Sequence, residues 1–167
     1  MLFYSICMVP ILIVDDAQED LVFAQRVLNS NRVQNPLVPL SSGRACLEYF
    51  TGNESPKGKL PCIVLLDMVM KPVSGLDVLR KLRDLPAAEG SVIIMLSGLA
   101  DTKMISEGYK LGASTFLFKP LVAAEITQML QSINGVTYTR TAAGAVLSIR
   151  GFSDKVTDRV IVKSPKL

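Results

Sequence analysis

Histidine is absent from this 167-residue chain, and its absence removes several kinds of chemistry. Ser-His-Asp and Cys-His catalysis both need an imidazole base, so neither is available here. For the same reason the chain cannot carry a phosphohistidine of its own. It has three cysteines but no CxxC pair, so a structural zinc site is not expected either.

Long apolar runs are also missing, and no stretch is long enough to span a bilayer. The apolar start, Met1–Met8, lacks a basic region and a cleavage site, so it predicts an extension of the first strand rather than a signal peptide. Met8 is an alternative start to Met1. Cys46 and Cys62 fall in apolar runs that are typical of small buried thiols. We therefore expect a reduced, cytoplasmic protein.

Charge of one sign does not dominate the chain, whose net charge is +3. Residues 1–133 carry twelve Lys and Arg against thirteen Asp and Glu, whereas residues 134–167 carry six against two. The main body has no electrostatic reason to bind nucleic acid, and the basic residues of the tail are too scattered to indicate it.

Short apolar runs alternate with helical patterns through most of the chain. Pro10–Val14 is a continuous apolar run, as in parallel strands buried on both faces, and Gln18–Leu28 has helical apolar spacing. The same alternation predicts further strands at Pro36–Leu40, Cys62–Leu66, Val92–Leu96 and Thr115–Phe118, and helices at Ser42–Phe50, Gly75–Asp84, Asp101–Leu111 and Leu121–Ile133. Five strand–helix repeats predict an α/β fold: a five-stranded parallel sheet with helices on both faces.

Polar residues follow four of these strands. They are Asp15 and Asp16 after the first strand, Asp67 after the third, Ser97 after the fourth and Lys119 after the fifth. Ligands of such sheets bind outside the carboxyl ends of the strands. Each residue alone has an ordinary interpretation, such as a helix cap for the Asp pair or a loop for Ser97-Gly98. Their convergence on one edge favours a functional site.

Three converging carboxylates repel one another, and a hard divalent cation such as Mg²⁺ relieves that repulsion. A carboxylate beside Mg²⁺ can attack phosphorus and form an acyl phosphate. Lys119 is the cation at this edge that could balance the transferring oxygens, and the hydroxyl of Ser97 could donate to them.

Together these residues resemble the signature of the receiver domains of two-component response regulators. The resemblance covers about Met8–Ile133, and the segment DMVMKPVSG, residues 67–75, has the family's spacing. It implies a flavodoxin-like receiver fold over residues 1–133. It also implies that Asp67 is the phosphoacceptor, and that Mg²⁺ is held by Asp67, by Asp16 directly, by Asp15 through water and by the backbone carbonyl of Val69. Ser97 and Lys119 would then hold the phosphoryl group, with Ser97 and Phe116 as the switch residues.

The sequence departs from the family pattern at Lys71, where proline is usual four residues after the acceptor; here Pro72 follows instead. The loops between the Asp pair and Asp67 are longer than in minimal receivers, as in receivers that are partners of phytochrome-type kinases. By resemblance, the residues that set the lifetime of the acyl phosphate are Val69 and Leu99. Both are apolar and cannot orient an attacking water, which predicts slow self-dephosphorylation; packing of the two against each other would predict the same by excluding water.

The resemblance implies protein partners. The phosphodonor would be a sensor histidine kinase or a phosphotransfer protein. A downstream protein would bind the face made by the fourth helix, the fifth strand and the fifth helix, which includes Lys103, Tyr109, Lys110 and Phe116. A homodimer is one option for the assembly.

Residues 134–167 form a C-terminal extension that is too short for a winged-helix or enzyme domain. Val136–Thr141 and Ala145–Arg150 have the pattern of a hairpin around Ala143-Gly144, and Val156–Val162 of a further strand; a disordered tail is the alternative. Two rival functions stay open. A phosphohydrolase with an aspartyl-phosphate intermediate would resemble the haloacid dehalogenase family, whose DxDx[TV] motif Asp67-Met-Val does not match, and a scaffold would keep the fold without switching.

Overall fold

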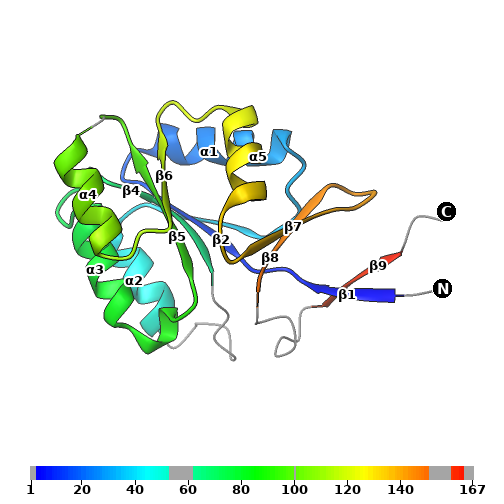
Figure 1. The fold of residues 1–167 in the computed structure, drawn as a ribbon. Helices are drawn as coiled ribbons and strands as arrows, with labels where there is room; N and C mark the ends of the chain where they lie inside the picture. The colour runs from blue at the N-terminus through cyan, green and yellow to red at the C-terminus, as the bar shows by residue number, and fades with distance from the viewer. Residues whose placement is uncertain (1–2, 53–61, 100, 151–158, 164–167) are drawn as a thin grey trace.

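Strands and helices alternate along most of the chain, as the computed structural model in Figure 1 shows. It describes residues 3–52, 62–99, 101–150 and 159–163. The strands are β1 (Phe3–Cys7), β2 (Ile11–Val14), β3 (Leu37–Leu40), β4 (Ile63–Asp67), β5 (Val92–Ser97), β6 (Thr115–Phe118), β7 (Val136–Arg140), β8 (Ala145–Ile149) and β9 (Arg159–Lys163). The helices are α1 (Gln18–Ser30), α2 (Gly43–Thr51), α3 (Gly75–Asp84), α4 (Thr102–Lys110) and α5 (Ala123–Ser132), with a short 3₁₀ turn at Pro86–Ala88.

The predicted five-stranded parallel sheet is confirmed, with the strand order β3-β2-β4-β5-β6. The central strands β2, β4 and β5 are buried along their whole length, which explains their uninterrupted apolar runs. Asp67 and Ser97 are the last residues of β4 and β5, whereas the sequence pattern predicts each of them just after its strand.

Helices cover both faces of the sheet. On one face, α1 and α5 contact each other and enclose a core that includes Ile11, Ile13, Leu65 and Ile94. On the other face α2, α3 and α4 enclose the alternate residues of the same strands. The period-2 alternation of each strand divides its side chains between these two cores. None of the helices in the described ranges is long and apolar enough to cross a membrane.

Helix starts follow ordinary capping chemistry where the loops leave the sheet. Ser42, Ser74 and Asp101 accept hydrogen bonds from backbone amides in the first turns of α2, α3 and α4. These caps fix where each helix begins on the far side of its loop. The loops that carry Asp67 and Ser97 are therefore held at both ends.

The predicted extension of the first strand is wrong. Residues 3–7 form a separate strand, β1, which pairs antiparallel with β9 in a two-stranded sheet outside the main one. Both neighbours of β2 begin opposite Ile11, with Leu37 on one side and Ile63 on the other. The strand pairing of the parallel sheet therefore begins at Ile11, and residues 3–7 pair with β9 instead. Figure 1 shows the β1–β9 ribbon leading away from the body toward both termini.

After α5 the chain forms a β-hairpin, β7–β8, in the register Val136↔Ile149 to Arg140↔Ala145. Val136, Leu147 and Ile149 are buried in the α1–α5 core. Part of the segment predicted as a strand at 156–162 lies outside the described residues, and its end overlaps β9.

A buried asparagine joins the hairpin to the body. The side-chain amide of Asn35 donates to the carbonyl oxygens of Val9 and Leu147, at 2.7 Å each, and its oxygen accepts from the amide of Leu147 at 2.8 Å. Asn35 thus hydrogen-bonds the backbone of β8 as a neighbouring strand would. The amide of Gln34 and the carbonyl of Arg32 add two backbone hydrogen bonds to Ala145.

Candidate phosphorylation site

Asp67 ends β4 at the carboxyl edge of the sheet, where its side chain is only 6% exposed. The backbone around it is packed closely: a Cβ on Gly75, the first residue of α3, would clash with the carbonyl oxygen of Asp67. Only glycine lets α3 begin this close to Asp67, which accounts for a glycine at position 75. Burial raises the pKa of the Asp67 carboxyl, and the hydrogen bond and charge of Lys119 oppose that rise without cancelling it.

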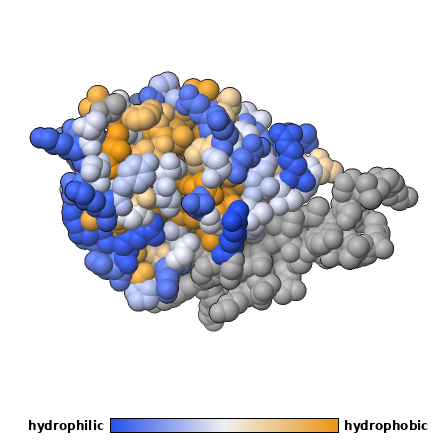
Figure 2. All heavy atoms as spheres, viewed as in Figure 1, coloured by the Kyte–Doolittle hydropathy of each residue, from blue (hydrophilic) through white to orange (hydrophobic). Residues whose placement is uncertain are grey.

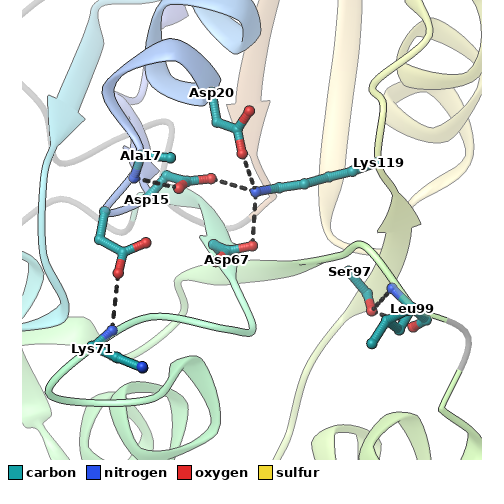
Figure 3. Close-up of polar contacts among 9 residues, drawn as sticks. Asp15, Ala17, Asp20, Asp67, Lys71, Ser97, Leu99 and Lys119 are labelled. Atoms are coloured by element: carbon teal, nitrogen blue, oxygen red, sulfur yellow. Dashed lines mark hydrogen bonds and ion pairs between the residues drawn. The ribbon is translucent and has the colours of Figure 1, made fainter.

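Lys119 lies at the centre of the site, as Figure 3 shows. Its Nζ is 2.9 Å from Oδ1 of Asp67, 2.6 Å from Oδ2 of Asp15 and 2.8 Å from Oδ2 of Asp20. Burial by itself lowers the pKa of the ammonium, but hydrogen bonds to these three carboxylates outweigh it and leave the pKa above its ordinary value. Lys119 is thus charged and aimed at Asp67.

Asp16 is held from the opposite side of the site. Its Oδ2 accepts a hydrogen bond from the backbone amide of Lys71 at 3.0 Å. Lys71 occupies the position where the family usually has proline, which has no backbone N–H to donate. The departure seen in the sequence therefore supplies a contact to one of the predicted metal ligands.

The three acids are close enough to share a cation. One carboxylate oxygen from each of Asp15, Asp16 and Asp67 lies within 4.8 Å of the others. Asp15 and Asp67 are buried and Asp16 is exposed, so the cluster opens to solvent on one side. An all-oxygen set with an open side suits Mg²⁺, which keeps several of its waters. The residues present fit the predicted metal.

Ser97 ends β5 on the same edge, but its hydroxyl does not face the acid cluster. It donates to the carbonyl oxygen of Leu99 at 2.5 Å and accepts from the amide of Leu99 at 3.2 Å. In Figure 3 Ser97 and Leu99 stand apart from the group around Lys119. The structure brings together Asp15, Asp16, Asp67 and Lys119 and leaves Ser97 turned away.

Phe116, on β6, packs against α4. Its ring centroid lies 4.9 Å from that of Tyr109. A Cβ on Gly108 would lie 2.5 Å from the ring's Cζ, so the ring occupies the space above this glycine. Gly108 interrupts the sequence pattern of the helix but makes room for Phe116.

The two residues predicted to set the lifetime of the acyl phosphate are mainly solvent-facing. Val69 is 64% exposed and Leu99 is 73% exposed. Most of each side chain faces solvent instead of packing against the other. The backbone amide of Val69 donates a hydrogen bond to Asp67. The role of the Val69 carbonyl as a metal ligand stays a prediction.

Asp20 is the site residue that sequence reasoning missed. Acids in the first turn of a helix are common because they interact favourably with the helix dipole, so the residue type and position of Asp20 do not mark it as a site residue. One signal was present: Asp20 closely follows the Asp15-Asp16 pair and lies in the first turn of the helix that begins just after that pair.

A family model described as the response regulator receiver domain matches residues 11–131. The chain belongs to this family. The match spans the five strands of the parallel sheet and every residue of the acid cluster. Receiver domains are in general phosphoacceptors with a role in signalling, and they bind Mg²⁺ in an acidic pocket.

Relatives of several kinds share this domain. The 3',5'-cyclic-nucleotide phosphodiesterase regA of Dictyostelium discoideum is 30% identical over 135 residues, which are 78% of this chain and 16% of that protein. Response regulator Rcp1 of Synechocystis is 23% identical over 124 residues, 74% of this chain and 84% of that protein. The structure of the bacteriophytochrome response regulator AtBRR aligns with a TM-score of 0.66 and 26% identity, covering 75% of this chain and 91% of that one. The chemotaxis protein CheY4 of Vibrio cholerae, at 20% identity and a TM-score of 0.63, supports the fold.

The chain spans 16%, 34% and 52% of the length of three of the first curated relatives that it matches. Two of these are phosphodiesterases by name. That activity is a property of those longer proteins, because the family match in this chain is to a receiver domain.

Proposed function

We propose that this protein is a phosphorylation-dependent signalling switch whose acceptor is Asp67. The observation that supports this most directly is the environment of that carboxylate. It is buried at a strand end, it lies 2.9 Å from a charged lysine, and two further acids flank it at metal-binding separation. A structural ion pair would not need the additional acids.

These 167 residues contain no histidine, so they cannot themselves supply the phosphoryl group from a phosphohistidine. We expect the donor to be the phosphohistidine of a sensor kinase or of a phosphotransfer protein. An oxygen of Asp67 attacks the phosphorus, an O–P bond forms and the P–N bond breaks. The electron pair returns to the imidazole nitrogen, which then takes a proton from solvent.

Each residue of the cluster has a part in this transfer. The Lys119 ammonium lies beside Asp67 and can donate to the oxygens that gain charge, without reorganisation. Mg²⁺, held by Asp15, Asp16, Asp67 and the carbonyl of Val69, would supply the remaining positive charge. Ser97 would donate its hydroxyl to the phosphoryl group after leaving its present contact with Leu99.

The output is a change in the α4–β6–α5 face. Ser97 would move toward the phosphoryl group and Phe116 would turn inward from its place above Gly108, altering the surface near Tyr109, Lys103 and Lys110. Phosphorylation then favours one of two packings by contacts that the other packing lacks. A downstream protein that binds this face would read the difference. Comparing amide spectra with and without beryllofluoride checks it, since an unchanged 109–118 region would contradict the proposed output.

The acceptor is tested by incubating the full chain with Mg²⁺ and acetyl phosphate and analysing it by intact mass, with Asp67→Asn as the control. We expect a stable adduct that resists acid, is labile to base and is absent from the control. Release of phosphate without an adduct would indicate a phosphohydrolase. Neither adduct nor release would indicate a scaffold that does not switch.

A further inference from the structure

The Lys119 ammonium has three carboxylate partners, and Asp20 differs from the other two. An ammonium has three N–H donors, and three carboxylates surround this one, at 2.6 Å for Asp15, 2.8 Å for Asp20 and 2.9 Å for Asp67. Asp15 and Asp67 also belong to the cluster that could hold a metal, whereas Asp20 does not. Asp20 comes instead from the first turn of α1, and Figure 3 shows its carboxylate approaching Lys119 from the helix side.

The carboxylates of Asp15 and Asp67 have two uses, since they pair with Lys119 and also belong to the metal and phosphorylation site. A cation at the acid cluster would take an oxygen from each of Asp15 and Asp67, whose carboxylates now accept from the ammonium, and phosphorylation converts one oxygen of Asp67 into the bridge to phosphorus. Each event weakens the hold of these two residues on Lys119. Asp20 is outside the acid cluster, so neither event draws on its carboxylate.

We propose that Asp20 is a positioning residue that keeps the Lys119 ammonium beside Asp67 while Asp15 and Asp67 are engaged by a metal ion or a phosphoryl group. The role rests on the proposed function of Asp67 as the acceptor. Without Asp20, the ammonium would pair more closely with Asp15 and Asp67 before the reaction and would be poorly fixed during it. Both effects slow phosphoryl transfer.

The ordinary alternative is that Asp20 only stabilises the start of α1 through the helix dipole. Its neighbour Glu19 separates the two explanations. Glu19 lies in the same first turn and lines the same cavity of about 290 Å³ beside Lys119. No ion pair links Glu19 to Lys119 in the part of the chain that the structure describes. Glu19→Gln therefore removes the same charge from the same helix end without removing the contact.

A measurement that does not depend on phosphorylation follows the Nζ signal of Lys119 by NMR in ¹⁵N-lysine-labelled protein, with Lys119→Arg to assign it. We expect a protected Nζ signal in the wild type, both without metal and with Mg²⁺ added. It should persist in Glu19→Gln and in Asp20→Glu, and in Asp20→Asn it should be lost when Mg²⁺ is added. An Nζ signal in Asp20→Asn that matches the wild type with Mg²⁺ present would overturn the proposal.

The second measurement is the rate of phosphorylation by acetyl phosphate at saturating Mg²⁺. Because Asp20 is 44% exposed, loss of this charge-assisted hydrogen bond should slow Asp20→Asn by about tenfold, below the limit for a buried pair. Glu19→Gln should stay within about twofold of the wild type, as a surface charge does, and Asp20→Glu should recover most of the rate. Equal rates for Asp20→Asn and Glu19→Gln would overturn the role. If the wild type accepts no phosphoryl group, the proposed function fails, and the Nζ spectra alone decide on Asp20.

Discussion

Single residues at this site act largely through backbone geometry. Asp16 depends on the amide of Lys71, Asp67 lies against the backbone of α3, and Ser97 exchanges hydrogen bonds with the backbone of Leu99. Substitutions at the neighbouring positions that change these backbone contacts should therefore alter the site even though the site side chains themselves are kept.

Lys71→Pro should weaken Mg²⁺ binding, because it removes the N–H that orients Asp16. The loss of a hydrogen bond to an exposed carboxylate corresponds to roughly a three- to tenfold rise in Kd. Lys71→Ala keeps the N–H and is the matched control, expected to bind like the wild type. The affinities are measured by titration with Mg²⁺. Equal Kd values for the two variants would show that the amide does not matter.

Self-dephosphorylation should be slow in the wild type and faster in Val69→Asn. Val69 and Leu99 are largely exposed, so a polar side chain at position 69 can reach the approach of water and orient it, which contributes up to about 100-fold. Leu99→Ala should also speed decay by opening that approach, and Val69→Ile should leave it unchanged. Decay is followed after the donor is removed. No acceleration in either test variant would mean that the lifetime is set elsewhere.

Cys46 and Cys62 should resist alkylation in the folded protein at pH 8, because burial raises the pKa of each thiol to about 12. In the unfolded chain these thiols ionise near 9.0. Between these two values only the unfolded state releases the protons, so the free energy of unfolding should fall as pH rises from about 9 to 12. Mass spectrometry after brief alkylation should find at most one label per chain, because Cys7 is the third cysteine. Denaturant melts from about pH 9 to 12 check the fall in the free energy of unfolding. Rapid labelling of both thiols would contradict this assignment.

At the scale of elements, α4 and β6 are coupled through one small residue. Gly108 leaves the space that the Phe116 ring occupies, so the position of the proposed switch aromatic depends on a helix residue with no side chain. Polar side chains cover much of the face in Figure 2 where α3 and α4 lie, with apolar patches toward α1 and β6. The surface proposed for output is thus mixed in character and can change when one ring moves.

Gly108→Ala should displace Phe116 without phosphorylation. The new Cβ meets the far end of the ring, which can rotate away, and alanine should stabilise the helix by about 0.5–1 kcal/mol relative to glycine. The expected result is a shifted Phe116 ring signal in NMR spectra of an intact fold. Thr102→Ala, at the other end of α4, serves as a control that leaves the ring signal in place. An unchanged ring signal in Gly108→Ala would show that the slot does not set the ring's position.

The individual strands and helices could be predicted from the sequence, whereas the contacts between them could not. The apolar runs located all five parallel strands, and the strand ends brought four of the site residues into view. The contact of Asp20 depends on how α1 rests against the loop after β6, and the donation by Lys71 depends on the path of its loop. The pairing of β1 with β9 joins opposite ends of the chain, beyond the reach of any local pattern.

At the scale of the whole molecule, Asn35 connects two segments that are 112 residues apart in sequence. Asn35→Ala leaves the backbone groups of Val9 and Leu147 without partners in a buried place, each costing about 1–3 kcal/mol. We expect the free energy of unfolding to fall by at least about 2 kcal/mol in denaturant melts. Gln34→Ala, which removes only an exposed hydrogen bond to Arg32, should cost little. A small effect of Asn35→Ala would show that water replaces it.

The hairpin also bears on how this receiver could be exchanged between proteins. The family match stops at residue 131, but Val136, Leu147 and Ile149 lie in the same apolar cluster as Ile11 and Leu28. A chimera in which this chain is cut after residue 131 would expose that cluster to water. The exposed apolar surface would favour aggregation for reasons unrelated to signalling. A graft that keeps residues 134–149 with the receiver transfers a closed core, so the transferable unit is longer than the alignment.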